Sequence, residues 1–183
     1  MTKPCKALRF AVFYKKKNAG TRRKMRRRDS GTGLVFMEKE LLTSRSEAET
    51  EKFAAEFAAK LPRGSVVALH GDLGAGKTVF ARGLARGLGV TGAVSSPTYT
   101  IVQEYDLSDG GRFYHLDLYR ISDEHAALGF GVDEFLDDPR SITLLEWPER
   151  IAGLLPPGTI HLRLLHRSET ERTIRRIDPA EEK

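Results

Sequence analysis

The sequence predicts a three-layer α/β fold with a mixed central sheet. Residues 65–69 form a short apolar run with glycine beyond it, which is typical of a buried parallel strand. A helical pattern follows at residues 77–88. Further along, two strand-like runs flank the turn signal Ser-Asp-Gly-Gly at residues 108–111, which predicts an antiparallel hairpin. Parallel and antiparallel strands within 183 residues indicate one domain around a mixed sheet.

Composition excludes a membrane-spanning protein and one built on disulfides or cysteine-bound metal, and it shows that the positive charge is concentrated at the start of the chain. No apolar run approaches the roughly 18 residues of a membrane-spanning helix, and a single cysteine, Cys5, leaves no pair for a disulfide or a cysteine-based metal site. We therefore expect a cytoplasmic protein. The net charge of +5 comes from residues 1–28, which hold 12 of the 30 Lys and Arg residues and no acid. The remainder carries 18 basic and 25 acidic residues, a net of −7.

This charge division predicts a basic, unstructured leader at residues 1–33, a folded domain at 34–178 and a short tail at 179–183. The leader has three interpretations: an arm that neutralises nucleic-acid phosphates, a targeting peptide, or a solvated tail upstream of a later start at Met25 or Met37. Its apolar stretch is too short for a secretory core, and serine is scarce for a transit peptide. The solvated tail is the favoured interpretation.

The first half of the domain is predicted to begin with a strand and a capped helix. Residues 34–42 alternate loosely between apolar and polar, as a strand does. Ser46 and Glu49 have the spacing of a capping box, in which each side chain bonds a backbone N–H at the start of a helix. This helix is predicted to end at about Lys60, before Pro62.

The helix at residues 77–88 carries two pairs of residues four positions apart. Gly83 and Gly87 predict close packing of this helix on the sheet, because glycine removes the side chain from the contact. Arg82 and Arg86 are predicted to be solvated charges on its outer face.

The second half of the chain is predicted to consist mainly of strands. The first two form the hairpin, and the last two close the chain as antiparallel strands. The predicted strands span residues 100–105, 112–118, 141–147, 159–167 and 170–177.

Residues 71–78 match the pattern G-x-x-x-x-G-K-[ST] at every fixed position. Glycines in such a loop let backbone N–H groups turn toward phosphates, and the following helix adds the positive end of its dipole. Lys77 supplies a charge to the β and γ phosphates, and the Thr78 hydroxyl ligates Mg²⁺. The motif therefore predicts a P-loop NTPase-like fold that binds ATP with Mg²⁺. The residues predicted to contact the nucleotide are Asp72, Leu73, Gly74, Ala75, Gly76, Lys77 and Thr78.

Two predicted strands end in a carboxylate. Glu146 follows a mostly apolar run and precedes the only tryptophan, Trp147, and Asp117 ends the run at residues 113–117. A P-loop nucleotidase needs such a carboxylate to hold Mg²⁺. Either acid could instead form a salt bridge or cap a helix, but two of them beside a phosphate loop favour a role in catalysis.

The segment at residues 95–99, Ser-Ser-Pro-Thr-Tyr, lies between the phosphate-loop helix and the next predicted strand. Many nucleotidases carry a mobile loop there, with a hydroxyl for Mg²⁺ or water. Thr98 is the candidate for that hydroxyl. The alternative is an ordinary loop shaped by Pro97.

Several polar residues outside these motifs have less certain roles. His115 is interpreted as structural, and His70 and His161 lack the spacing of metal ligands. Arg120 either contacts a phosphate or pairs with Asp117.

Four segments together resemble the bacterial TsaE (YjeE) family. They are GDLGAGKT at 71–78, SPTYT at 96–100, HLDLYR at 115–120 and LEWP at 145–148, and the similarity extends over about 41–177. The resemblance implies a small cytoplasmic ATPase required for the threonylcarbamoyl modification of adenosine 37 in tRNAs that read ANN codons. It also implies assembly with the TsaD and TsaB proteins, where TsaD transfers the carbamoyl group and ATP hydrolysis resets the machinery.

The resemblance assigns roles to individual residues as well. Glu146 matches the glutamate associated with Mg²⁺, and Asp117 matches the essential aspartate near the nucleotide. Val79 is a departure, because a second threonine is usual there and one phosphate contact is lost. The residues implied to be catalytic are Asp117, Glu146 and Thr98, with Thr78 and Glu146 at the metal and Trp147 beside the nucleotide.

Two other functions compete with an ATPase of tRNA modification. A P-loop small-molecule kinase would use the same loop and a strand-end acid, but such kinases carry an Arg-rich lid in their second half. Residues 129–140 are acidic instead. The third candidate is a nucleic-acid-binding module that uses the leader, with nucleotide binding only structural. The ATPase is the favoured function.

Overall fold

The structure, a computed structural model, describes residues 25–28 and 35–179. Its strands are β1 (Met25–Arg28), β2 (Val35–Ser44), β3 (Ser65–His70), β4 (Val102–Asp106), β5 (Arg112–Asp117), β6 (Ser141–Glu146), β7 (Ile160–His166) and β8 (Arg172–Pro179). In the described residues they form one sheet in the order β1-β2-β8-β7-β3-β6-β5-β4. β3 pairs in parallel with β6 and β7, and β5 with β6. The other pairs are antiparallel, so the sheet is mixed as predicted.

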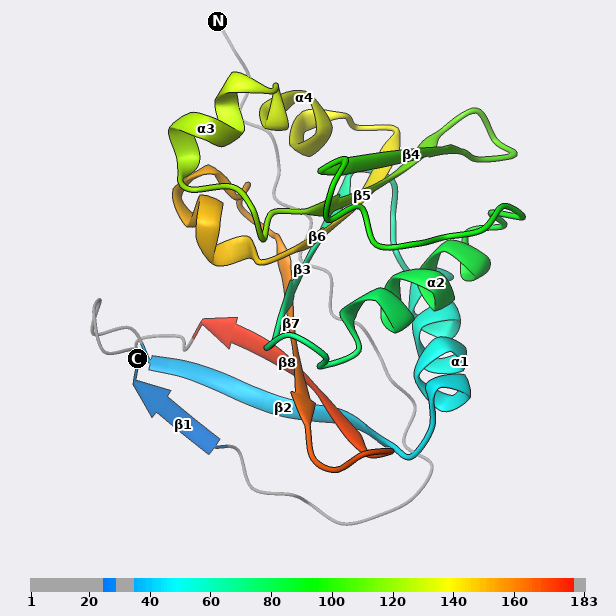
Figure 1. Ribbon diagram of the computed structural model, residues 1–183, viewed down its shortest axis with the longest axis vertical. Coiled ribbons are helices and arrows are strands. Elements are labelled where there is room, and N and C mark those ends of the chain that lie inside the picture. Colours follow the sequence, from blue (N-terminus) through cyan, green and yellow to red (C-terminus); the bar gives the residue numbers. More distant parts are fainter. Residues whose placement is uncertain (1–24, 29–34, 180–183) are drawn as a thin grey trace, which may run out of the picture.

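Helices cover both faces of this sheet, which confirms the predicted three layers (Figure 1). They are α1 (Glu47–Ala58), α2 (Lys77–Gly87), α3 (Glu124–Gly129), α4 (Val132–Asp137) and the 3-10 helix η1 (Pro148–Leu154). Side chains of β3 alternate between two cores: Val67 and Leu69 pack with α1 and α2, whereas Val66 and Ala68 pack with α3, α4 and η1. None of the described helices is long and apolar enough to cross a bilayer.

The predicted strands and helices are all present, and their ends lie within two residues of the prediction. The Ser46 half of the capping box is confirmed, because Ser46 Oγ accepts a hydrogen bond from the Glu49 N–H at 3.2 Å. The Glu49 carboxylate, however, reaches back to the N–H of Arg45 at 2.8 Å rather than to that of Ser46. β4 begins two residues late, since Ile101 still belongs to a turn in which its N–H donates to Pro97 O.

Part of the predicted leader belongs to the sheet. Met25–Arg28 form β1, which pairs antiparallel with β2 from Met25↔Glu38 to Arg28↔Val35. For these four residues the expectation of an unstructured leader is wrong, because backbone pairing to the open edge of β2 satisfies hydrogen-bonding groups on both strands. The other residues of the leader, and residues 180–183 of the tail, lie outside the described residues.

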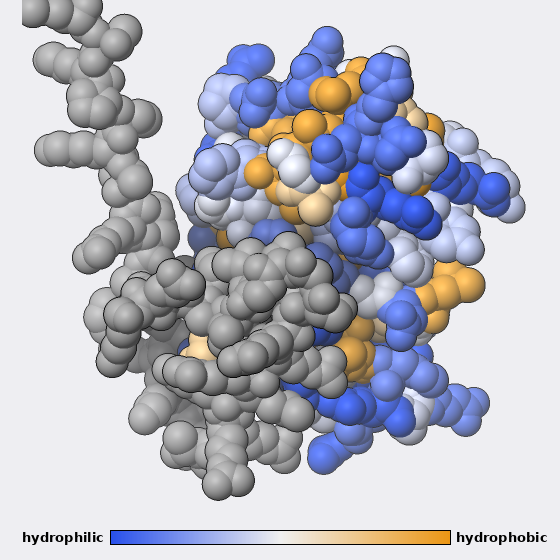
Figure 2. All heavy atoms as spheres, turned by 90° about the vertical axis from the view of Figure 1, so that its left-hand side faces the viewer, coloured by the Kyte–Doolittle hydropathy of each residue, from blue (hydrophilic) through white to orange (hydrophobic). Residues whose placement is uncertain are grey.

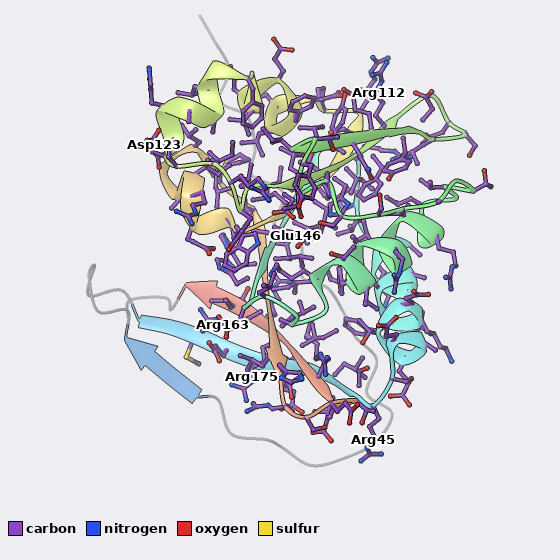
Figure 3. All side chains as sticks on the ribbon, in the orientation of Figure 1. Arg45, Arg112, Asp123, Glu146, Arg163 and Arg175 are labelled. Carbon is purple, nitrogen blue, oxygen red and sulfur yellow. The ribbon has the colours of Figure 1, made fainter. Side chains whose placement is uncertain are left out.

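The antiparallel part of the sheet is joined by a buried carboxylate. Glu38 of β2 is 5% exposed and accepts hydrogen bonds from Arg175 of β8, at 3.0 Å, and from Arg163 of β7. Figure 3 labels both arginines on neighbouring strands. Two cations around one buried acid compensate the cost of removing its charge from water.

The two glycines of α2 contact α1 rather than the sheet, so that prediction is wrong. A Cβ added at Gly83 would lie 2.3 Å from Glu51 O, and one at Gly87 would lie 2.5 Å from Ala55 O. The backbones of the two helices therefore approach more closely than any side chain at these positions allows.

The two arginines of α2 were predicted to be solvated charges, but both form ion pairs with α1. Arg82 forms ion pairs with Glu47 at 2.7 Å and Glu51 at 3.0 Å, and Arg86 pairs with Glu51 at 2.6 Å. These pairs span α1 and α2 at the protein surface, where each contributes only about 0–1 kcal/mol. Close backbone packing therefore accounts for more of this contact than charge does.

The opposite helical layer has a mixed outer surface. Figure 2, which views the molecule from that side, shows apolar residues set among polar ones. Leu128 of α3 is one of the large apolar side chains exposed in the described residues, at 45%.

Candidate functional site

The carboxyl ends of three parallel strands meet at one edge of the sheet. Glu146, the last residue of β6, is the register partner of Leu69 in β3 and of Asp117 in β5. The loop at residues 71–76 leaves this same edge and leads into α2. Figure 3 shows Glu146 near the middle of the molecule, between the two helical layers. This edge is where open α/β sheets bind their ligands.

Backbone geometry of the loop depends on glycine. Gly71 has a φ of 146°, and a Cβ there would lie 2.5 Å from Leu164 O, so no other residue fits. Gly76, immediately before α2, has a φ of 95°. Glycine at these two positions lets the loop backbone curve into a cradle in front of a helix N-terminus, an arrangement that fits a phosphate group.

Lys77 carries the positive charge of this cradle. Its Nζ donates to Gly71 O at 2.7 Å and Asp72 O at 3.1 Å, and lies 4.2 Å from the centre of the Trp147 ring. Burial lowers the pKa of Lys77, while the carboxylates of Glu146 and Asp117 oppose that change. The ammonium group thus lies at the centre of the loop, next to the tryptophan that sequence reasoning associated with the site.

Glu146 lies against the first turn of α2. Thr78 Oγ1 donates to Glu146 Oε1 at 3.4 Å, and His115 Nε2 lies 3.0 Å from the same oxygen. Glu146 is 3% exposed. A hydroxyl and a carboxylate are hard oxygen donors, and Mg²⁺ is usually bound by one or two carboxylates together with phosphates and water. The donor set of Thr78 and Glu146 therefore fits Mg²⁺.

Asp117 is held by the loop that contains the predicted hydroxyl. Its Oδ2 accepts hydrogen bonds from Thr98 Oγ1 at 2.5 Å and Ser96 Oγ at 3.0 Å, and its Oδ1 accepts from the N–H of Tyr119 at 3.0 Å. The structure thus brings Thr98 to Asp117. Of the two predicted roles of Arg120, a pair with Asp117 is not formed in the described residues, because its guanidinium lies 4.5 Å from the Tyr99 ring centre instead, and contact with a phosphate stays a prediction.

A cavity of about 540 Å³ opens over these groups and extends beyond them. Sequence reasoning did not find its far side, which consists of the start of α1 and the turn between β7 and β8. Among these residues, Arg172 lies close to the phosphate loop, because a Cβ on Gly76 would be 3.9 Å from its Nε. The additional lining residues are Arg45, Ser46, Glu47, Thr50, Glu169, Thr170 and Arg172.

Three features together define a P-loop nucleotide-binding protein. They are the mixed α/β sheet, the glycine cradle with a buried lysine at a helix N-terminus, and the strand-end carboxylate that lies against the first turn of that helix. The family described as "Threonylcarbamoyl adenosine biosynthesis protein TsaE" matches residues 44–174. The chain belongs to this TsaE family.

Individual relatives agree with this family. The protein named "tRNA threonylcarbamoyladenosine biosynthesis protein TsaE" of Bacillus subtilis is 42% identical over 127 residues, 69% of this chain and 77% of that protein. The protein of the same name from Synechocystis is 44% identical over 108 residues, 57% of this chain and 68% of that protein. A crystal structure of Bacillus subtilis YdiB superimposes with a TM-score of 0.62 at 32% identity, covering 80% of this chain and 88% of that one. Family and fold both indicate nucleotide binding.

Proposed function

We propose that this protein binds ATP with Mg²⁺ in the cavity at the phosphate loop and hydrolyses it, in support of tRNA threonylcarbamoylation in the cytoplasm. One observation carries the proposal: Glu146, buried at the end of β6, lies 3.4 Å from the hydroxyl of the phosphate-loop residue Thr78. A buried acid beside a phosphate loop repels an anion unless a cation lies between them. This geometry supports a metal-bound phosphate rather than a free one.

The residues of the site divide the work of phosphate binding and hydrolysis. The loop N–H groups and Lys77 hold the β and γ phosphates, and Thr78 and Glu146 hold Mg²⁺. When bound, Mg²⁺ neutralises charge on the phosphates. Asp117, fixed by Thr98, orients the attacking water and accepts its proton, while the water oxygen bonds to the γ-phosphorus and ADP leaves with the bridging oxygen.

The far side of the cavity lies beyond the proposed phosphate site, where a bound nucleotide would place its nucleoside. If the phosphates occupy the cradle, the adenine and ribose extend toward the start of α1 and the β7–β8 turn, where Ser46 and Arg172 line the cavity. Arg172 is fixed there, because its Nη1 donates to the carbonyl oxygens of Ser168 at 2.7 Å and Glu171 at 3.1 Å. We propose this region as the nucleoside-binding part of the site.

TsaD and TsaB are the proposed partners, and tRNA is reached through their complex. The relatives are named for tRNA threonylcarbamoyladenosine biosynthesis. Large apolar side chains stand exposed close to the nucleotide site, which supports a protein contact there: Leu73 is 80% exposed, Tyr99 86% and Tyr119 43%.

A hydrolysis assay separates this function from its alternative. The full chain is incubated with γ-labelled ATP and Mg²⁺, alone and with purified TsaD, TsaB and unmodified tRNA. Label released as inorganic phosphate, together with modified tRNA only when all proteins are present, is the expected result. Label transferred to a small molecule would identify a kinase, and failure to bind ATP at all would overturn the proposal.

A further inference from the structure

His115 is the residue of the site whose surroundings are least explained by packing. It lies in the middle of β5, is 0% exposed, and stacks on Phe113 with ring centres 6.4 Å apart and planes 12° apart. Its Nδ1 is the buried side-chain polar atom that has no hydrogen-bond partner in the described part of the chain. A leucine or methionine would fill the same volume without leaving a polar atom unsatisfied, which costs about 1–3 kcal/mol.

The other ring nitrogen defines the protonation pattern. An ionised carboxylate only accepts hydrogen bonds, so the 3.0 Å contact to Glu146 Oε1 requires that His115 Nε2 carries the hydrogen. Nδ1 is then a bare lone pair, because a hydrogen there would be buried without an acceptor. His115 thus donates one hydrogen bond into the site through Nε2.

We infer that His115 is a positioning residue that fixes the Glu146 carboxylate for the metal–nucleotide complex, an inference that rests on the proposed function. The side-chain hydrogen bonds described for Glu146 both involve Oε1, one with His115 and one with Thr78. One donor from strand β5 and one from helix α2 fix the rotation of the carboxylate and leave Oε2 for the metal or its water shell. Residues that orient a ligand in this way typically change metal affinity by about 10–100-fold when removed.

Three substitutions at position 115 separate positioning from packing. His115→Gln keeps a donor at nearly the reach of Nε2. His115→Asn is equally polar but shorter by one methylene, and His115→Leu fills the space with no donor. Calorimetry on the full chain measures ATP affinity with excess Mg²⁺ and again with EDTA. Thermal unfolding of each variant records its stability, and Thr143→Val serves as a control, because Thr143 is also buried in the sheet but donates to Phe135 O.

The expected result is a loss confined to the metal-dependent part of binding. In wild type, Mg²⁺ increases ATP affinity. In the Asn and Leu variants, the ATP affinity measured with Mg²⁺ is lower by about tenfold or more, while the affinity measured in EDTA stays at the wild-type value. The Gln variant and Thr143→Val retain the wild-type increase. If the Leu variant does not fold, the Gln and Asn pair decides alone, since both are polar and only their reach differs.

Two results would count against these ideas, and they are distinguishable. In the first result, all His115 variants show the wild-type response to Mg²⁺ and differ only in melting temperature. His115 would then be a packing residue, and this inference alone would be overturned. A wild-type chain that binds ATP equally well with and without Mg²⁺ would instead overturn the proposed metal site at Thr78 and Glu146.

Discussion

Asp117 and Glu146 are register partners in the parallel pairing of β5 with β6, so their carboxylates end adjacent strands at the same level. Both are 3% exposed, yet they have different hydrogen-bond partners. Asp117 accepts from the loop hydroxyls of Thr98 and Ser96, whereas Glu146 accepts from Thr78 on α2. Two neighbouring acids with separate partners can hold separate roles, one toward water and one toward the metal.

Neutral isosteres of these acids test that division. Asp117→Asn and Glu146→Gln keep the shape of each side chain but remove its charge. In the proposed roles the carboxylates act mainly in the transition state, so each change should lower ATP turnover at least tenfold, about 1.4 kcal/mol of barrier. Turnover is measured as phosphate release with TsaD and TsaB present. Glu56→Gln, an exposed change on α1, is the control and should keep wild-type turnover. Wild-type turnover in both site variants would mean that these acids are structural.

Lys77→Ala tests the cradle itself. The charged contact to phosphate contributes roughly 1.5–3 kcal/mol, so ATP affinity should fall by about 10–100-fold while the melting temperature stays close to that of wild type. Trp147 reports the same event, because its ring lies 4.2 Å from Lys77 Nζ and its emission should shift when Mg–ATP is added. Lys52→Ala changes an exposed lysine on α1 and should alter neither signal. An unchanged ATP affinity in Lys77→Ala would be incompatible with phosphate binding at this loop.

The parts of the site that sequence could predict are those with local signals. The glycine spacing of the loop, the Ser46–Glu49 capping box and the turn at 108–111 each act over a few residues. The meeting of Asp117 with Glu146 was also predictable, since parallel strands bring their carboxyl ends to one edge. Thr98 donates to Asp117, a contact that the loop interpretation did not specify, and its predicted role toward Mg²⁺ or water stays a prediction.

The other parts of the site depend on contacts between segments that are distant in the sequence, and no local pattern indicates such contacts. Arg172 reaches the phosphate loop because β8 pairs with both β2 and β7. His115 was interpreted as structural. Its contact with Glu146 depends on the register of β5 and β6, which the sequence does not indicate. The helices α3 and α4 were missed because each has only six residues, too few to show a helical period.

The packing of α2 on α1 makes a prediction about stability. In Gly83→Ala the new methyl group would meet the backbone of Glu51 at 2.3 Å, where no side chain can move aside. The free energy of unfolding should fall by about 1–3 kcal/mol, as in other overpacked contacts. Gly129→Ala is a matched control, because a Cβ at Gly129 would have no neighbour within 4 Å. Denaturant unfolding measures both, and equal stability of the two variants would argue against the close contact of the helices.

The last prediction concerns pH and a pair of histidines, His70 directly before the phosphate loop and His161 in β7. His70 Nε2 and His161 Nδ1 are 3.0 Å apart. Burial, together with the neighbouring His161 and Arg163, lowers the pKa of His70 from 6.5 to about 4, and burial lowers the pKa of His161. Glu149 is the nearest acid to His70, at 3.9 Å, and it does not reverse this effect.

A histidine whose pKa is lower in the folded chain destabilises the fold as pH falls, because the unfolded chain then binds a proton that the folded chain does not. The free energy of unfolding is therefore at its full value above pH 6.5, as far as His70 is concerned. It falls progressively as the pH drops from 6.5 to about 4. From pH 7 to pH 5 we expect a loss of roughly 1–2 kcal/mol from this pair. Urea unfolding at the two pH values measures it. His70→Gln should remove most of the loss, whereas His166→Gln, an exposed change at the end of β7, should keep it. If His70→Gln and wild type lose the same stability between pH 7 and 5, other groups are responsible and the pair titrates alike in both states.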